Sequence, residues 1–469
     1  MTSNSLPKRI TIGKTTEHPV IEFAAEELKK HLARMTGCEV VVDDAAPESL
    51  ALGLMADFRD VAAPDVANPG LDDAIHIDTS GAQGIIAGIN PRSVLLAVYR
   101  YLSELGCRWV RPGADGAYVP RVDELGNVSV SETPSYRHRA VCIEGAVSYE
   151  HIREMIDWLP KLGFNGYFIQ FREAHTFFAR WYRHTGNPNE QGEPLSIEKA
   201  RQYTEMLEDQ ITQRGLLYHK VGHGWTCEPF NIPGLGWDKQ EQSAPPEIAK
   251  YLAEVNGKRD FWKGVALDTN LCYSNPEVRR IIVDAIVAYA HEHRNIDYLH
   301  FWLADGTNNN CECTECVKAR PSDFYVMMLN DLDKRLTDAG LDTRIVFLIY
   351  VDLLWPPLEQ KFENPDRFVL MFAPIVRTYS ETFEVSDTLP ELPPFERNKL
   401  EFPKSVDANV AFLRAWQEIF GGDSFDFDYH LMWDHSNDPG HMHISRTIAD
   451  DMKGLAKIGL HGYVSCQIQ

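Results

Sequence analysis

The residues best suited to chemistry lie in one segment, 296–316, which reads IDYLHFWLADGTNNNCECTEC. An apolar and aromatic run ends there on an acid, Asp305, and Gly306 and three asparagines follow it. A strand that delivers a carboxylate into a polar loop is how an α/β barrel builds an active site. Burial beside Trp302 would favour the protonated carboxyl and suit it as an acid. Asp305 is therefore a candidate general acid, with capping of its own loop as the alternative.

A second carboxylate is required if the reaction is cleavage of a glycosidic bond. One carboxyl must protonate the leaving oxygen, and an anionic group must act across the sugar ring. Glu144 follows a predicted strand at 139–144, and Asp352 follows one at 344–350. Both are candidates, and the sequence does not separate them; Glu144 could also pair with Arg172.

Further polar and aromatic residues follow the predicted strands. Aromatic faces stack on the apolar faces of sugar rings, and arginine binds hydroxyl or carboxyl groups. These residue types predict a sugar-binding pocket where the strand ends converge. The candidates for substrate binding are Arg172, His223, Trp225, Trp302, Tyr350, Arg377, Tyr429 and His430.

A cysteine cluster follows the Asp305 loop directly. Cys311, Cys313 and Cys316 form C-x-C-x-x-C, and thiolates this close together can bind one zinc ion. A structural site needs a fourth ligand, and Cys272 is the candidate. Free thiols that pack a loop and a redox role are the alternatives. We expect the chemistry itself to need no cofactor.

Eight predicted strands alternate with helical segments after residue 136, which is typical of a (β/α)8 TIM-type barrel. The strands are predicted at 139–144, 164–171, 216–221, 296–303, 344–350, 367–372, 425–431 and 461–468. The helices are predicted at 149–162, 197–214, 276–293, 323–339, 405–420 and 444–458. A doubly wound sheet is the competing fold, but it would want a glycine-rich phosphate loop where this chain reads CIEGAVSYE.

Residues 1–130 form a separate small α+β domain in this prediction. Short apolar strands surround two amphipathic helices, one that ends at Gly37 and one that begins at Pro91. Prolines and glycines crowd residues 111–135, so we place the domain boundary there. The barrel is predicted to occupy residues 136–469.

Composition excludes some partners. The chain has 469 residues and a formal net charge of -22, which argues against nucleic acid or an anionic membrane as the main partner. No apolar run reaches the roughly 18 residues of a membrane helix. The first residues, MTSNSLPKRITIG, contain no apolar signal region, so we expect a cytoplasmic protein with reduced thiols. A monomer and a homo-oligomer both stay open.

Two stretches of sequence resemble known families. The segments RITIG, HLARMTG and GIIAGINPRSVLLAVYRYLSELGCRW resemble the small domain that precedes the barrel in glycoside hydrolase family 20 β-N-acetylhexosaminidases and in α-glucuronidases. The stretches LCYSNPEV, ADG…CECTEC and FDYHLMWD resemble the bacterial domain of unknown function 4838, a barrel usually found behind that small domain. Together the two resemblances imply a carbohydrate-active barrel.

The resemblance to family 20 includes one departure. In that family the fourth strand ends in an Asp-Glu pair whose Glu is the acid, and the corresponding positions here read Ala304 and Asp305. The resemblance therefore implies an acid at Asp305 without the partner that positions a 2-acetamido group. Other sugars stay open, among them a uronic acid held by Arg172 or Arg377.

We therefore predict a glycoside hydrolase that acts on an oligosaccharide, possible substrates including uronic acids and amino sugars. One alternative is a barrel that binds carbohydrate without cleaving it. A metal-dependent barrel hydrolase ranks last, because the first predicted strand lacks an H-x-H pair of metal ligands.

Overall fold

The computed structural model describes residues 6–46, 48–185, 187–432 and 434–468. The chain divides into two compact units. The first comprises Met1–Arg139, Ser148–Tyr167 and Gln202–Leu217; the second comprises Ala140–Val147, Phe168–Arg201 and Tyr218–Gln469. Within the described residues, no helix combines the length and apolarity needed to cross a membrane.

The first unit contains a mixed six-stranded sheet in the order β2-β1-β3-β5-β4-β8. The strands are β1 (Arg9–Lys14), β2 (Glu39–Val42), β3 (Leu50–Leu54), β4 (Ile75–Ser80), β5 (Gln83–Gly88) and β8 (Val128–Glu132). Strands β1, β2, β3 and β5 pair in parallel, whereas β4 is antiparallel to both β5 and β8. A two-stranded sheet, β6 (Arg108–Trp109) and β7 (Ala117–Tyr118), is not hydrogen-bonded to it.

Helices α1 (Pro19–Thr36) and α2 (Pro91–Glu104) pack against each other and share one apolar core with the sheet. Each helix begins at a proline, whose missing N–H would have no partner in the first turn. The side chain of Asn90 caps α2 by accepting from the amide of Ser93 at 2.9 Å. Helix α1 ends at Gly37, which takes the left-handed conformation that other residues adopt at a cost.

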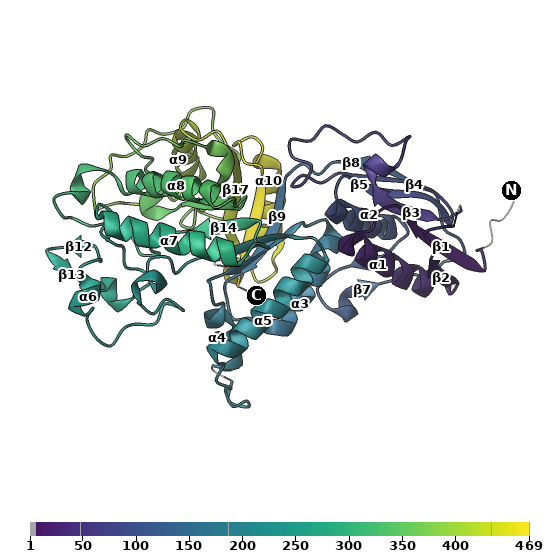
Figure 1. Cartoon of the computed structure of the whole chain (residues 1–469), viewed down its shortest axis with the longest axis horizontal. Helices are drawn as coiled ribbons and strands as arrows, with labels where there is room; N and C mark the ends of the chain where they lie inside the picture. Colours follow the sequence, from purple (N-terminus) through teal and green to yellow (C-terminus); the bar gives the residue numbers. More distant parts are fainter. Residues whose placement is uncertain (1–5, 47, 186, 433, 469) are drawn as a thin grey trace. The chain divides into compact units, whose positions relative to one another are not determined.

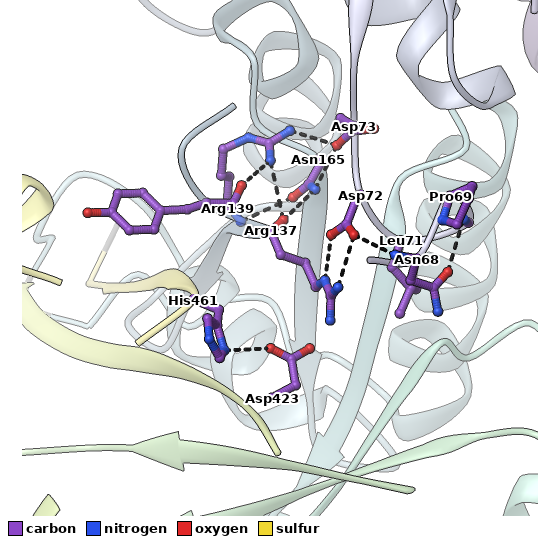
Figure 2. A network of polar contacts seen from close by, with 12 residues as sticks. Asn68, Pro69, Leu71, Asp72, Asp73, Arg137, Arg139, Asn165, Asp423 and His461 are labelled. Carbon is purple, nitrogen blue, oxygen red and sulfur yellow. Dashed lines mark hydrogen bonds and ion pairs between the residues drawn. The ribbon is translucent and has the colours of Figure 1, made fainter. Parts of the chain in front are cut away.

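A buried polar network surrounds Asp73 in the same unit (Figure 2). The Asp73 carboxylate accepts hydrogen bonds from the Arg92 and Arg139 guanidinium groups, at 2.9 and 2.7 Å. Ser93 and Asn165 donate two more, at 2.8 and 2.9 Å. Every lone pair direction of this buried carboxylate therefore has a donor, which is what a buried charge requires.

Eight parallel strands close into a barrel, as the sequence predicts. In order around the barrel they are β9 (His138–Ile143), β10 (Gly166–Gln170), β11 (Leu217–Gly222), β14 (Tyr298–Phe301), β15 (Arg344–Ile349), β16 (Phe368–Phe372), β17 (Asp423–Leu431) and β18 (Gly462–Gln467). Apolar and aromatic side chains fill the interior: the ring of Phe168 stacks on His300 with 4.0 Å between centroids. A filled interior leaves the strand ends as the place for a site.

The helices that follow these strands agree with the predicted alternation. They are α3 (Tyr149–Trp158), α4 (His175–Tyr182), α5 (Ile197–Gln213), α6 (Pro246–Ala249), α7 (Pro276–Glu292), α8 (Pro321–Asp338), α9 (Val406–Gln417) and α10 (Met442–Gly454). Helices α7 and α8 lie side by side (Figure 1). A short hairpin, β12 (Glu254–Val255) and β13 (Lys258–Arg259), interrupts the long connection from β11 to α7.

Candidate active site

A cavity of about 280 Å³ lies at the carboxyl ends of the barrel strands. Its lining combines carboxylates, aromatic rings and one guanidinium group. The polar and aromatic residues are Glu144, Arg180, His223, Trp237, Trp302, Asp305, Tyr350 and Tyr429, and the apolar ones are Leu348, Met371, Ile375 and Met432. Strands β9, β11, β14, β15, β16 and β17 all contribute, because parallel strands of a barrel end at one mouth.

Asp305 faces this cavity from the loop after β14. Its backbone amide donates to the carbonyl of Leu267 at 3.0 Å, which fixes the start of the loop. The indole N–H of Trp237 donates to Asp305 Oδ2 at 2.8 Å. Asp305 therefore presents to the cavity a carboxylate whose position is fixed by the Trp237 hydrogen bond.

Glu144 directly follows β9 and lines the same cavity. The amide of Gln170 donates to its Oε1 atom. Burial raises the pKa of Glu144, the hydrogen bond from Gln170 opposes that rise, and the negative charge of Asp305 adds to it; the resulting pKa is about 7. A carboxyl group with this pKa can hold a proton at neutral pH and donate it.

Tyr350, which directly follows β15, lies close enough to Asp305 and Glu144 for both charges to act on its phenol. Burial raises the pKa of its phenol well above the ordinary value, and the charges of Asp305 and Glu144 act in the same direction. The phenol is therefore a neutral hydroxyl throughout the physiological range. It can donate a hydrogen bond to a carboxylate or to a bound hydroxyl.

His223 packs among the aromatic rings of the lining. Its imidazole makes edge-to-face contacts with Trp302 and Trp237, at centroid distances of 4.7 and 5.3 Å. Burial lowers the pKa of His223, so the ring is neutral at pH 7.

Gly222, the residue before His223, has a φ of 93°, and a Cβ there would lie 2.8 Å from the Trp302 ring. Glycine is therefore required for Trp302 to reach the cavity.

Two residues near His223 have strained backbone conformations. Val221, the penultimate residue of β11, has a φ of 79°, and Phe171 after β10 has a φ of 66°. The amide of Phe171 donates to the Val221 carbonyl at 3.0 Å, which holds the two in place. A left-handed conformation at a β-branched residue costs about 1–3 kcal/mol, and such strain collects at functional sites.

The structure places several predicted residues outside the cavity lining. Trp225 is fully buried, and its indole N–H donates to the His300 carbonyl at 2.9 Å. Arg172 pairs with Glu228 at 3.1 Å. Neither side chain lines the cavity: Trp225 is enclosed by the protein, and Arg172 is half-buried beside Glu228.

Asp352 braces the loop that follows Asp305. Its carboxylate accepts from the backbone amide of Asn308 at 3.0 and 3.1 Å and from the Asn310 side chain at 3.0 Å. Burial raises the pKa of Asp352 to about 6. Glu144 lines the cavity of about 280 Å³, whereas Asp352 holds the loop after Asp305 and lines a second pocket that shares Asp305 and Tyr350 with it.

Arg377 and His430 belong to a fully buried ion cluster. Arg377 Nη2 lies 3.4 Å from Asp428 Oδ2 and also contacts Asp451. The two nitrogens of His430 lie 2.8 Å from Asp428 and 2.7 Å from Asp451. These partners correct the expectation that Arg377 and His430 contact substrate: both side chains are fully enclosed beside carboxylates, although Nε and Nη1 of Arg377 have no hydrogen-bond partner among the described residues.

The same cluster contains a histidine and two carboxylates with the spacing of a cation site, Asp428, His430 and Asp451. The guanidinium of Arg377 already lies among these atoms and supplies the positive charge. Although burial alone would lower the pKa of His430, Asp428 and Asp451 reverse that effect and raise it. The cluster thus reads as a buried ion network that stabilises β17.

The sequence prediction missed three residues at or near the cavity. Trp237 and Arg180 line it, and Asp268 lies close enough to Asp305 for the two charges to interact. Burial and the nearby charge of Asp305 raise the pKa of Asp268 to about 6. Asp268 had a readable signal, since the apolar run VAL ends on it as the run before Asp305 does. Trp237 and Arg180 lie in a loop and on α4, where no local pattern marks them.

The four predicted metal-ligating cysteines lie together. The Sγ atoms of Cys272, Cys311, Cys313 and Cys316 are all within 4.8 Å of one another. Three of the cysteines are buried and Cys313 is half-buried. This cluster lies on the loops that carry Asp268 and Asp305.

No family model and no curated protein matches the sequence. The resemblance to the domain of unknown function 4838 therefore stays a prediction. Solved structures do match the fold. One is a family GH115 4-O-methyl-α-glucuronidase with specificity for decorated arabinogalactans, at 11% identity and a TM-score of 0.56 over 99% of this chain. This chain corresponds to 54% of that enzyme's length.

A second match is the family GH20 β-N-acetylhexosaminidase from Streptomyces coelicolor A3(2), at 13% identity and a TM-score of 0.49. The match covers 91% of this chain and 73% of that enzyme. At this identity the likeness to solved structures concerns the fold. The fold of this chain is thus similar to that of the family GH115 enzyme.

Proposed function

We propose that this chain is a glycoside hydrolase that cleaves O-glycosidic bonds with two carboxyl groups, Glu144 and Asp305. The observation that supports this most is their position, since both line one cavity of about 280 Å³ together with two tryptophans and two tyrosines. This volume is close to the roughly 300 Å³ at the lower end of ligand pockets. Indole and phenol rings supply the flat faces on which a sugar ring stacks.

The two carboxyls divide the roles. Glu144, with a pKa of about 7, is the proton donor to the leaving oxygen. Asp305 accepts the Trp237 indole N–H and is the anionic group on the other side of the bond. This exchanges the roles that the sequence alone favours, because the burial of Glu144 beside a neutral amide could not be read from its neighbours in the chain.

The substrate class follows from the charge of the lining. Among the described residues that line the cavity, Arg180 is the one with a permanent positive charge. Its guanidinium lies over the Trp237 ring at 5.4 Å, which orients it beside the aromatic wall. A guanidinium binds a carboxylate through two parallel hydrogen bonds. We therefore propose a substrate that carries a uronic acid, held by Arg180 and not by Arg172 or Arg377, the two arginines that the sequence left open for this role.

A panel of aryl glycosides tests the activity, with matched uronides and neutral hexosides in both anomeric forms. Wild type should release the aryl group from at least one uronide, and Glu144→Gln and Asp305→Asn should each lower kcat by about 10²–10⁴. Glu247→Gln, at an exposed position on α6, is the matched control and should keep the wild-type rate. Wild-type rates in both cavity variants would contradict the proposal.

The same panel separates cleavage from binding. If wild type binds oligosaccharides by calorimetry but cleaves no member of the panel, the chain is a carbohydrate-binding barrel and the hydrolase assignment is wrong. Arg180→Met should raise KM for uronides at least about tenfold and leave neutral hexosides unaffected. An equal change for both classes would contradict the proposed uronic acid.

A further inference from the structure

We propose that Cys272, Cys311, Cys313 and Cys316 bind one zinc ion in a closed structural site. In a tetrahedral zinc–thiolate centre the Zn–S bonds are about 2.3 Å, so neighbouring sulfurs are about 3.8 Å apart. The Sγ atom of Cys272 lies 3.7 Å from that of Cys313 and 3.9 Å from that of Cys316. All four sulfurs are within 4.8 Å of one another. A disulfide would need about 2.05 Å, so these distances fit a shared ion better than sulfur–sulfur bonds.

The surroundings of the sulfurs suit a thiolate site. The backbone amides of Glu254 and Ser274 point at Cys311 and Cys316, with N–Sγ distances of 3.3 and 3.4 Å. Amide N–H groups aimed at sulfur stabilise thiolate ligands and set their orientation. The Ser274 hydroxyl lies 3.1 Å from the Cys316 sulfur and 3.7 Å from that of Cys313. The same hydroxyl lies 3.6 Å from the Cys272 sulfur, so each of the four ligands has a polar group beside it.

Positive charge surrounds the cluster on several sides. Zinc bound by four thiolates carries a net charge of about -2, which a partly buried site must offset. Arg259, Arg279 and Arg397 each act electrostatically on cysteines of the cluster. Arg397 is held there by hydrogen bonds to the carbonyls of Cys311 and Cys316, at 3.2 and 2.8 Å. Four protein ligands leave no open position for water, so the site is structural.

The proposed ion joins the loop that carries Asp268 to the loop that begins at Asp305, a residue of the cavity lining. Cys272 belongs to the loop that carries Asp268, and the other three cysteines follow Asp305. Asn309 crosses between the loops: its Oδ1 accepts from the Asn270 amide at 2.8 Å, and its Nδ2 donates to the Asp268 carbonyl at 2.9 Å. The zinc ion and Asn309 would hold both carboxylate-bearing loops at two points each. The zinc site itself does not depend on the proposed enzymatic activity.

Elemental analysis of the purified full chain tests the site. Wild type should contain about one zinc per chain, and Cys313→Ser should lose it on dialysis against a weak chelator. Cys38→Ser is the matched control, since Cys38 is also half-buried but lies in the small domain; it should keep the zinc. Cobalt-substituted wild type should show the absorption of a tetrahedral tetrathiolate centre.

A second measurement covers the case in which Cys313→Ser does not fold. Titration of wild type with a mercurial reagent should release zinc, followed with a metal-binding dye, as the thiols react. Hydrogen exchange of residues 266–275 and 303–316 should quicken after zinc removal. Free thiols without bound metal, iron in place of zinc, or disulfides detected by mass would each overturn the zinc assignment.

Discussion

Two buried carboxylates, one in each unit, have opposite surroundings. Asp73 of the small domain is 2% exposed and accepts from two guanidinium groups, a hydroxyl and an amide. Burial alone would raise its pKa, but Arg92 and Arg139 overcome that effect and hold the pKa at about 2. Glu144 of the barrel is 8% exposed and receives a side-chain hydrogen bond from the neutral amide of Gln170. At Glu144 the effect of burial outweighs that of the hydrogen bond, and the pKa rises to about 7.

The comparison shows that burial alone does not decide whether a carboxyl group is ionised. An acid surrounded by cations stays ionised and stabilises the fold, whereas an acid buried with a neutral partner keeps a proton that it can give away. The number of cationic partners, and not the depth of burial, separates the structural carboxylate from the candidate catalytic one. Each prediction below changes one carboxylate and asks which kind it is.

The largest effect should come from Asp73→Asn. The change leaves Arg92 and Arg139 buried without their counter-charge, which costs about 3–5 kcal/mol of unfolding free energy. Urea unfolding at pH 7 measures it. Because Asp73 has a lowered pKa, its stabilisation is present above its ordinary pKa near 4 and is lost as the pH falls through about 2. The difference between wild type and variant should therefore shrink at low pH.

Asp78→Asn, at an exposed position on β4, is the matched control and should change stability by less than about 0.5 kcal/mol. A loss below about 1 kcal/mol in Asp73→Asn would remove the contrast between the two carboxylates.

Glu144→Gln should change the free energy of unfolding in the opposite direction and stabilise the protein at pH 8. The folded protein must ionise a carboxyl whose pKa is raised, so wild type is penalised above pH 7, and the penalty disappears as the pH falls through 7 to about 4.5. The variant has no such group and should be more stable than wild type by about 3 kcal/mol at pH 8. At pH 4.5 the two should be equal. Urea unfolding at both pH values checks this, and a destabilised variant at pH 8 would show that Glu144 is a structural anion like Asp73.

Asp352→Asn should give the smallest effect. This carboxylate is buried with amide donors, so one lost or inverted hydrogen bond costs about 1–2 kcal/mol of stability. Aryl glycoside turnover should fall less than tenfold, because the residue acts on the loop after Asp305 and not on substrate. A loss of turnover equal to that of Asp305→Asn would place Asp352 in the reaction instead.

Local patterns in the sequence were enough to predict the barrel and one of the two carboxylates of the candidate site, Asp305. Alternation of apolar strands with amphipathic helices predicts the barrel, and the apolar run before Asp305 predicts that this acid follows a strand. The spacing of Cys311, Cys313 and Cys316 brings these thiols together whatever the fold. Such features depend on neighbours within a few residues, which is what sequence periodicity reports.

Only the tertiary structure decided which polar residues share the cavity. Glu144 and Asp352 look alike in sequence, yet one meets Gln170 and the cavity while the other meets Asn308. Arg377 follows β16 and His430 lies near the end of β17, where substrate contacts are expected, but Asp451 from helix α10 pairs with both. Burial and hydrogen-bond partners come from segments 20 to 80 residues away, so a carboxyl's charge state is a property of the fold and not of its neighbours in the chain.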